Sequence, residues 1–338
     1  MNNKPITIKD LARILNINVS TVSRALRDNP EISAKTRKKV QDLAKQLNYV
    51  PNPIAVALKT NKSYTIGVIV PTIVNSFFSN VVVAIEEYAD KMGYNVLVAS
   101  SNEQMIKEMK NINIFKANSI DGIIISLSQE TDNYDHIKRV CDSNIPLVMF
   151  DRTTKELNAS KVVADDSDAA SMAIEHLIGL NKRNIAILTG PNHLLISKNR
   201  LKGYIKALQN NKIHIKNELI INCELDVHDA KKKMLNALNK GIKIDAVFGI
   251  SDDLAIGAIQ ACEELGINIP EDIAIVGFSN SNRSQYMKPS LSTLNLFPNI
   301  IGYKAAELLF EQIKKPKDFK IKKEIVKAEL IIRDSSNL

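Results

Sequence analysis

Residues 7–26 read TIKDLARILNINVSTVSRAL, and this stretch decides the fold of the amino-terminal part of the chain. Its first half places apolar residues at the i, i+3, i+4 and i+7 spacing of one helix face. These residues are Ile8, Leu11, Ala12 and Leu15. Thr7 is placed to cap this helix together with Asp10, and Asn16 tolerates the left-handed conformation that ends a helix. The first helix is therefore expected to end at Asn16.

Two further helices are expected after it. Asn18 is a suitable cap for the second helix. Its inner face is expected to carry Val19, Val22 and Leu26, and the opposite stripe Ser20, Arg24 and Arg27. The third helix is expected to begin at Ser33, to carry Lys35, Arg37, Lys38 and Lys39 in its first turns, and to bury Val40, Leu43, Ala44 and Leu47. Because a turn of about three residues joins the first two helices, the segment is a helix-turn-helix candidate.

The excess positive charge lies in this same part of the chain. Residues 1–62 hold 12 Lys and Arg against 4 Asp and Glu, whereas residues 63–338 hold 33 of each sign, out of a net charge of +8. This asymmetry indicates a small polyanion-binding module attached to a larger, electrically balanced part. The alternative is a basic face that is only solvated.

Geometry favours DNA as the polyanion. A helix fits the major groove, and a short polar stripe at its amino-terminal end reaches base edges. Arg24 can pair bidentately with guanine, while Ser20 and Thr21 can contact bases or phosphates. A generic three-helix bundle is the alternative, and charge, capping and turn length together favour DNA binding over it.

Four segments of this module carry a resemblance. They are residues 7–12 (TIKDLA), 20–26 (STVSRAL), 33–37 (SAKTR) and 47–52 (LNYVPN). In this order they resemble the headpiece of the LacI/GalR family of bacterial transcription regulators. The resemblance implies that Val19, Ser20 and Arg24 read bases. It also implies DNA contacts at Thr7, Ile8, Thr21, Ser23, Ser33 and Thr36.

A hinge is expected between the module and the rest of the chain. Residues 54–59 could form a helix that is too short to be stable alone in water. In the family such helices from two subunits enter the minor groove and insert a leucine that kinks the DNA. The resemblance makes Leu58 this wedge, with Ala55 allowing close approach and Asn52 near the DNA. Val56 and Ala57 stand where Arg-Ser is frequent, which departs from the family pattern.

The remaining chain alternates strand-like and helical segments, as in parallel sheets covered by helices on both faces. Strands are expected in one set at 65–70, 95–99, 122–127 and 147–150, and in a second set at 185–189, 219–221, 246–250 and 273–278. The fold class is thus α/β, with two similar lobes. The cleft between them, at the carboxyl ends of the strands, is the expected pocket.

Segments at those strand ends resemble the family's effector domain, which is similar to periplasmic sugar-binding proteins. The resemblance implies effector contacts at Asn75, Phe77, Asp151, Arg200, Ser251, Asp252 and Ser279. Arg200 is the leading candidate, with a structural ion pair as its alternative. For Phe77 the alternative to a ligand contact is a place in the core, and for Asp151 the alternative is an ion pair with Arg152. Ser279 and Ser251 replace the Asp and Asn that are frequent there, so a simple monosaccharide mode is not assumed.

The expected boundaries follow from the same resemblance. They are a headpiece at 1–50, a hinge at 51–63, a first lobe at 64–163 plus 294–322 and a second lobe at 164–292 plus 324–338. No leucine heptad follows Arg333, so the tetramer-forming tail of some family members is not expected. A homodimer is expected, since a two-fold protein reads a pseudo-palindromic double-stranded DNA operator.

Several other classes lose support from the sequence. The closest glycines are eight residues apart, which excludes the GxGxxG, P-loop and nucleophile-elbow motifs. Neither the five histidines nor Cys141, Cys223 and Cys262 have metal-ligand spacing, so no metal or cofactor is expected. No apolar run is long enough to span a membrane, and a cytoplasmic location is expected.

The expected function is a transcription regulator, most often a repressor in this family, that is switched by a small molecule of the sugar class. The alternatives are control by a protein partner, activation in place of repression, a soluble sugar-binding protein without DNA function, and an enzyme of carbohydrate metabolism.

Overall fold

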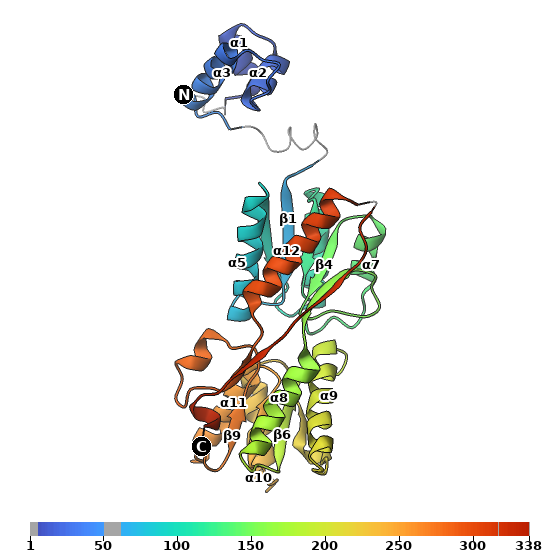
Figure 1. Cartoon of the computed structure of the whole chain (residues 1–338), viewed down its shortest axis with the longest axis vertical. Coiled ribbons are helices and arrows are strands. Elements are labelled where there is room, and N and C mark those ends of the chain that lie inside the picture. Colours follow the sequence, from blue (N-terminus) through green and yellow to red (C-terminus); the bar gives the residue numbers. More distant parts are fainter. Residues whose placement is uncertain (1–5, 51–61, 317, 338) are drawn as a thin grey trace. The chain divides into compact units, whose positions relative to one another are not determined.

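The computed structural model describes residues 6–50, 62–316 and 318–337. The chain forms two compact units, which divide between Ser63 and Tyr64. The small unit is helical and the large unit is α/β (Figure 1). No helix in the described part of the chain is long and apolar enough to cross a membrane.

The small unit contains three described helices, α1 (Ile8–Leu15), α2 (Val19–Leu26) and α3 (Ala34–Gln46). The predicted start and end of α1 are confirmed. Thr7 and Asp10 form a reciprocal capping box, and Asn16 adopts the left-handed conformation with φ of 51°. The fully buried centre of the bundle consists of Leu11, Val22, Ala25 and Val40.

One expectation about α2, the inward orientation of Val19, is wrong, and two others are met in part. Asn18 occupies the cap position of α2 but its side chain makes no capping hydrogen bond. Val19 does not face inward, because 40% of its surface is exposed at the first position of the helix. Leu43 of α3 and Leu47, the residue that follows the helix, are partly buried and pack against the core.

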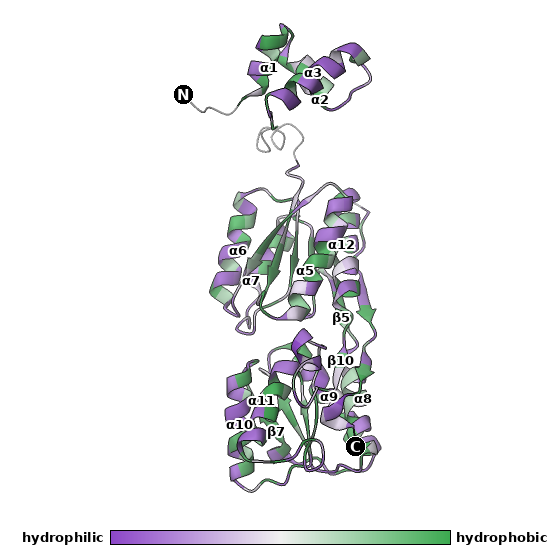
Figure 2. Ribbon diagram, turned by 90° about the vertical axis from the view of Figure 1, so that its left-hand side faces the viewer, coloured by the Kyte–Doolittle hydropathy of each residue, from purple (hydrophilic) through white to green (hydrophobic). Residues whose placement is uncertain are grey.

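The first lobe of the large unit, lobe 1, is built on a six-stranded parallel sheet in the order β11-β5-β4-β3-β1-β2. Its strands are β1 (Thr65–Val70), β2 (Asn95–Ser100), β3 (Gly122–Ile125), β4 (Leu147–Phe150), β5 (Ser160–Ala164) and β11 (Lys323–Val326). Its helices are α5 (Ser76–Lys91), α6 (Met105–Ala117), α7 (Asp135–Asp142) and α12 (Pro298–Lys314). The pairs α5/α12 and α6/α7 cover opposite faces of the sheet (Figure 2).

The second lobe, lobe 2, has a four-stranded parallel sheet in the order β7-β6-β8-β9. Its strands are β6 (Ile185–Thr189), β7 (Ile220–Asn222), β8 (Ala246–Gly249) and β9 (Ala274–Val276). Its helices are α8 (Asp166–Gly179), α9 (Leu195–Asn210), α10 (Val227–Asn239) and α11 (Asp252–Glu264). The short 3-10 helices are η1 (Asn217–Leu219), η2 (Asn282–Gln285) and η3 (Asp334–Ser336). Apolar strands lie between amphipathic helices here as well (Figure 2).

The connections between the lobes differ from the expected boundaries. Strand β11 pairs with β5 of lobe 1, with Lys323 opposite Lys161 and Val326 opposite Ala164. The chain therefore stays in lobe 1 up to Val326 and does not pass to lobe 2 at residue 323. Strands β10 (Thr293–Asn295) and β12 (Glu329–Ile331) pair antiparallel along two of the connections.

Candidate functional site

Helix α2 presents polar side chains to solvent in both of its turns. Ser20 is exposed, and 55% of the Arg24 side chain is exposed; among residues 6–50 and the other described residues, this side chain bonds only the exposed Glu31, at 3.2 Å. Because a surface ion pair of this kind contributes little, Arg24 is available to a base edge. The exposed position of Val19 at the start of α2 puts it on the same surface.

Hydroxyl groups implied in phosphate contact also organise the bundle. The Thr7 hydroxyl donates to Asp10 Oδ2 at 2.7 Å, and Ser33 caps α3 by accepting from the Thr36 amide. The hydroxyls of Ser33 and Thr36 lie 2.8 Å apart. Ile8 and Thr21 are half-buried, and Ser23 accepts from Arg27 at 2.9 Å. Asn52, Ala55 and Leu58, implied in the hinge, lie outside the described residues.

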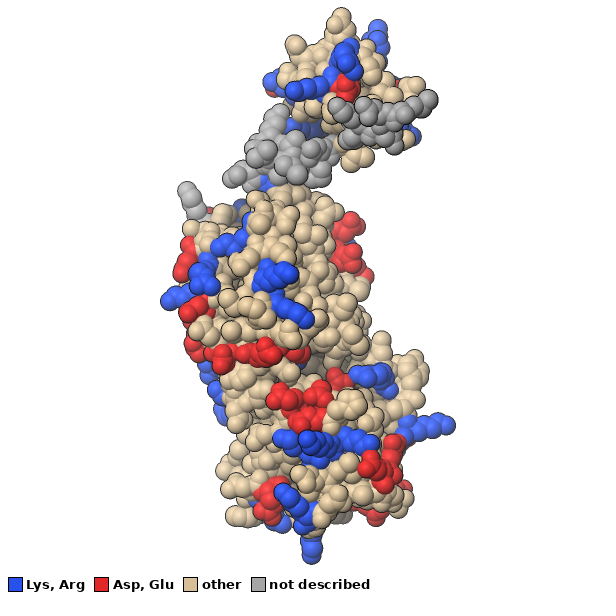
Figure 3. Space-filling view, turned by 180° about the vertical axis from the view of Figure 1, so that it is seen from behind, with Lys and Arg blue, Asp and Glu red and all other residues tan. Residues whose placement is uncertain are grey.

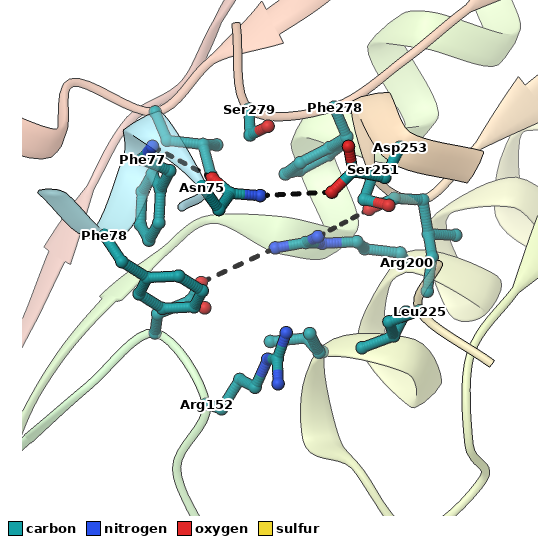
Figure 4. A pocket seen from close by; sticks show the side chains of 14 residues that line it. Asn75, Phe77, Phe78, Arg152, Arg200, Leu225, Ser251, Asp253, Phe278 and Ser279 are labelled. Atoms are coloured by element: carbon teal, nitrogen blue, oxygen red, sulfur yellow. Dashed lines mark hydrogen bonds and ion pairs between the residues drawn. The ribbon is translucent and has the colours of Figure 1, made fainter. Parts of the chain in front are cut away.

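A cavity lies between the two lobes, at the carboxyl ends of strands from both sheets. It is lined by Asn75, Phe77, Phe78, Asp151, Arg152, Ile196, Arg200, Leu225, Ile250, Ser251, Asp253, Phe278, Ser279 and Leu296 (Figure 4). Its volume is about 50 Å³. Since ligand pockets usually measure roughly 300–1,000 Å³, a sugar-sized molecule needs the lobes to move apart to enter.

Arg200 is at the centre of this cavity and is 4% exposed. Its Nε donates to Asp166 at 2.8 Å, its Nη1 donates to the Ile250 carbonyl at 2.6 Å, and Asp151 lies 3.8 Å from Nη2. Its guanidinium carbon lies 3.8 Å from the centre of the Phe278 ring. Arg200 therefore lines the pocket as predicted and also makes the ion pair that was its alternative.

The two carboxyls beside Arg200 are strongly affected by burial. Burial raises the pKa of Asp166 to about 6, while Arg200 acts in the opposite direction and Asp151 adds to the increase. Burial also raises the pKa of Asp151, again against the effect of Arg200. Because Asp151 belongs to lobe 1 and Arg200 to lobe 2, this pair joins the two walls of the cavity.

Asn75 and Phe77 lie at the beginning of α5. The Asn75 side chain caps the helix by accepting from the Phe77 amide at 2.9 Å, and its Nδ2 donates to Asp253 of lobe 2 at 3.3 Å. Phe77 is 4% exposed and packs edge-on against Phe78. It therefore belongs to both the core and the cavity wall.

The predicted contact at Asp252 is not part of the cavity lining. Its carboxylate is 2% exposed and accepts from the Ser281 amide and the Thr293 hydroxyl. The next residue, Asp253, lines the cavity instead and pairs with Arg283. A shift of one position on the first turn of α11 turns the carboxylate from the inside of lobe 2 to the cavity.

Both serines that depart from the family pattern line the cavity. The Ser251 hydroxyl caps α11 by accepting from the Leu254 amide at 3.3 Å. Ser279 has φ of 122°, and its amide donates to the Leu294 carbonyl at 2.9 Å. A non-glycine residue rarely adopts this backbone conformation, which is a feature of functional sites.

Arg152 is a cavity residue that the sequence indicated only as a partner of Asp151. In the structure it pairs instead with Glu103, whose carboxylate oxygens lie 2.9 and 2.6 Å from Arg152 Nη1. It is 7% exposed, and its Nε has no hydrogen-bond partner within the described residues. Figure 4 shows Arg152 and Arg200 both pointing into the space between the lobes.

No group of three or more His, Cys, Asp or Glu side chains in the described ranges is arranged to hold a metal ion. Cys223 and Cys262 are buried free thiols, and Cys141 is half-buried.

Comparison with known proteins agrees with both units. The family described as "Bacterial regulatory proteins, lacI family" matches residues 7–52, and the family "Periplasmic binding protein domain" matches residues 66–317. The chain is 34% identical over 98% of its length to the "Probable HTH-type transcriptional repressor ExuR" of Bacillus subtilis, of which 98% is covered.

Two solved structures are similar along most of the chain. The lac repressor dimer bound to operator and the anti-inducer ONPF is 26% identical with a TM-score of 0.87, covering 99% of this chain and 100% of the other. A LacI family transcriptional regulator from Enterococcus faecium with bound ribose is 26% identical with a TM-score of 0.69, covering 80% of this chain and 98% of the other. With a helix-turn-helix unit and a two-lobed cavity unit in this order, the chain belongs to the LacI family and is a DNA-binding transcription regulator.

Proposed function

We propose that this regulator is a repressor that works in the cytoplasm, binds a pseudo-palindromic operator as a homodimer, and is switched by a small polyhydroxylated ligand of the sugar class. The headpiece supplies the DNA contacts, in which Arg24 reads a base and the hydroxyl-bearing residues lie near phosphates. The ligand occupies the cavity between the lobes. The regulator has no catalytic role in this proposal.

The observation that carries the ligand assignment is the setting of Arg200. A planar guanidinium that is stacked on Phe278 and flanked by carboxylates offers fixed donors and acceptors over a small area. Aromatic faces with a few convergent polar groups are typical of pockets for small polar ligands. The Enterococcus faecium relative with bound ribose supports the sugar class.

The charge on the large unit supports the proposal that the headpiece binds DNA and the large unit binds the ligand. Acidic and basic side chains are interspersed over the face seen in Figure 3. A surface of balanced charge gives no general attraction to DNA, which leaves polyanion binding to the basic headpiece.

The test is thermal unfolding of the full chain against pentoses, hexoses, sugar phosphates, uronic acids and nucleobases. A ligand at 100 times its Kd adds about 2.7 kcal/mol of stability, which raises the Tm by roughly 2–4 °C in a domain of this size. Binding to a duplex selected from random sequence is measured in parallel at two salt concentrations. Failure to bind any duplex, at low salt as well as high, would refute the repressor assignment because phosphate contacts strengthen as salt falls.

A further inference from the structure

The lobes touch on two sides of the cavity. On one side, Asn75 donates to Asp253, and the Asn282 amide donates to the Ser76 hydroxyl at 3.1 Å. On the other side, the contacts converge on one residue, Gln129, in the loop after β3. This second side is the more buried, and it is connected to the cavity itself.

Gln129 makes two hydrogen bonds to lobe 2. Its carbonyl oxygen accepts from His193 Nε2 at 2.6 Å, and its side-chain oxygen accepts from the Leu225 amide at 3.1 Å. Leu225 also lines the cavity, whereas His193 does not. One loop of lobe 1 therefore holds the loops that follow β6 and β7 of lobe 2.

Gln129 is also connected to the cavity through lobe 1. Its amide donates to Glu103 Oε2 at 2.8 Å, and the same carboxylate pairs with Arg152. Because Arg152 has an unpaired, buried Nε at the cavity wall, a ligand oxygen that accepts from it also restrains Glu103 and the amide of Gln129. The path from cavity to lobe contact thus runs through three consecutive polar contacts.

The loop that carries Gln129 is held rigidly from behind. Glu108 is fully buried and accepts from the Ser128 amide at 2.7 Å and from the Thr131 hydroxyl at 3.1 Å. The Ser128 amide binds Glu108 Oε2. His136 Nε2 lies 2.7 Å from the other oxygen of this carboxylate, Oε1, to which Thr131 also donates. Because these buried bonds hold Ser128 and Thr131 on either side of Gln129, they fix the position of Gln129 in the loop.

We propose that Gln129 is the positioning residue that couples occupancy of the cavity to closure of the lobes. This inference rests on the proposed function in taking the cavity as the ligand site. Restraint of Glu103 by a ligand on Arg152 favours the Gln129 geometry that binds His193 and Leu225. By linkage, closure through Gln129 favours ligand binding to the same degree.

The coupling is tested by hydrogen exchange of the Leu225 amide in the full chain without ligand. His193→Ala leaves the acceptor of this amide in place, so faster exchange reports opening of the lobes and not a lost local bond. Loss of one such hydrogen bond predicts a roughly tenfold faster exchange. Glu103→Gln, which removes the ion pair to Arg152 without touching lobe 2, is expected to accelerate exchange of the same amide.

Two matched controls are available in the chain. Glu130→Gln alters the residue next to Gln129. Among the described residues, the Glu130 carboxylate accepts only from the Met105 amide. His228→Ala removes an exposed histidine from α10 of lobe 2. In both variants the Leu225 amide is expected to exchange its hydrogen at the wild-type rate.

Wild-type exchange in His193→Ala would overturn the proposal, because Gln129 would then not hold the lobes. Fast exchange in His193→Ala with wild-type exchange in Glu103→Gln would also overturn it, because the contact would be uncoupled from the cavity. Melting temperatures measured on each variant identify any general loss of fold. Duplex binding is assayed separately, so failure of the repressor assignment is distinguishable from failure of this coupling.

Discussion

Replacing Asp166 by Asn should change the way in which stability depends on pH. Asp166 is 5% exposed beside Arg200 and Asp151, and its pKa is raised from 3.8 to about 6. Between these values the unfolded chain has lost a proton that the folded chain keeps. Stability from this group is therefore present at low pH and is lost as the pH rises towards and through 6.

The size of the effect follows from the shift. One pKa unit corresponds to about 1.4 kcal/mol, so a shift of about two units corresponds to roughly 3 kcal/mol over the whole range. About 2 kcal/mol of this falls between pH 4.5 and 7. Asn does not titrate, so the stability of Asp166→Asn minus that of the wild type is expected to rise by about 2 kcal/mol over this interval.

Urea unfolding of the full chain, followed by far-UV circular dichroism at pH 4.5, 5.5, 6.2 and 7, measures this difference. Asp168→Asn is the matched control, since Asp168 lies in the same turn of α8 with a side chain that is 72% exposed and pairs only weakly with Lys206. The two buried carboxyls share Arg200, so the measured midpoint belongs to the pair. A difference that is flat, or that falls with rising pH, would refute the reasoning.

Substitutions at three further sites, with Gly179→Ala as a control for one of them, test the other elements. Gly203→Ala should lower the free energy of unfolding by about 3 kcal/mol, because its new Cβ would meet the Ser167 carbonyl where α8 and α9 pack. In the same urea experiment the control Gly179→Ala, with nothing near the new Cβ, should be neutral or stabilising. Arg24→Ala should cost about 1–3 kcal/mol at the specific duplex and relax preference for one base; binding measured on a library of single-base variants checks this, and unchanged selectivity would contradict it. Arg200→Ala should lose about 3–5 kcal/mol of stability because it leaves two buried carboxyls without their cation. Arg200→Lys keeps a cation and is therefore the variant for testing the ligand response. It should keep duplex binding and lose the ligand-induced rise in Tm, and an undiminished rise would exclude the proposed role.

The helices of the small unit could be predicted because their signals are local. The capping pair Thr7 and Asp10, the helix end at Asn16 and the spacing of Leu11 and Leu15 all act within one or two turns. Val19 was assigned to the wrong face because an apolar residue at the first turn of a helix does not decide by itself which way it points. The resemblance placed it at a base-reading position, where exposure is required.

Strands of the large unit divide in the same way. The bounds of β1, β4 and β6 were predicted to the residue because each is a short, continuous and almost wholly buried apolar run. Strands β5 and β11 were missed. Strand β5 opens with the polar residues Ser160 and Lys161, although it pairs with the nearby β4, and β11 opens with Lys323 and Glu324 and, among the described strands, pairs only with β5, some 160 residues away. Because the polar start of β11 gives no strand signal, its membership of lobe 1 was not predicted, and the error in the lobe boundary near residue 323 follows from it.

The cavity shows the same limit for side chains. Arg200 could be predicted to line the cavity because it lies in a family motif. In the structure it lines the cavity and also makes the ion pair that was its alternative, so the two features are compatible in one side chain, and its ligand contact stays a prediction. Arg152 and Asp253 could not be assigned, because Glu103 and Asn75, which orient them, are remote in sequence. Asp252 and Asp253 differ by one helical position, which sequence alone does not resolve.

The closed cavity determines how a ligand can act on this regulator. A cavity of about 50 Å³ has no room for a sugar, so ligand binding must begin by breaking contacts such as those of Gln129 with lobe 2. The free energy of those contacts is subtracted from the affinity, and it is recovered only where the lobes close again around the ligand. Because a ligand shifts an equilibrium only by its difference in affinity for the two states, a molecule that allows the Gln129 contacts to re-form and one that prevents this should have opposite effects on DNA binding. Measuring Leu225 amide exchange with each ligand that raises the Tm would separate these two groups, and an absence of any relation between exchange and duplex affinity would show that lobe closure is not the switch.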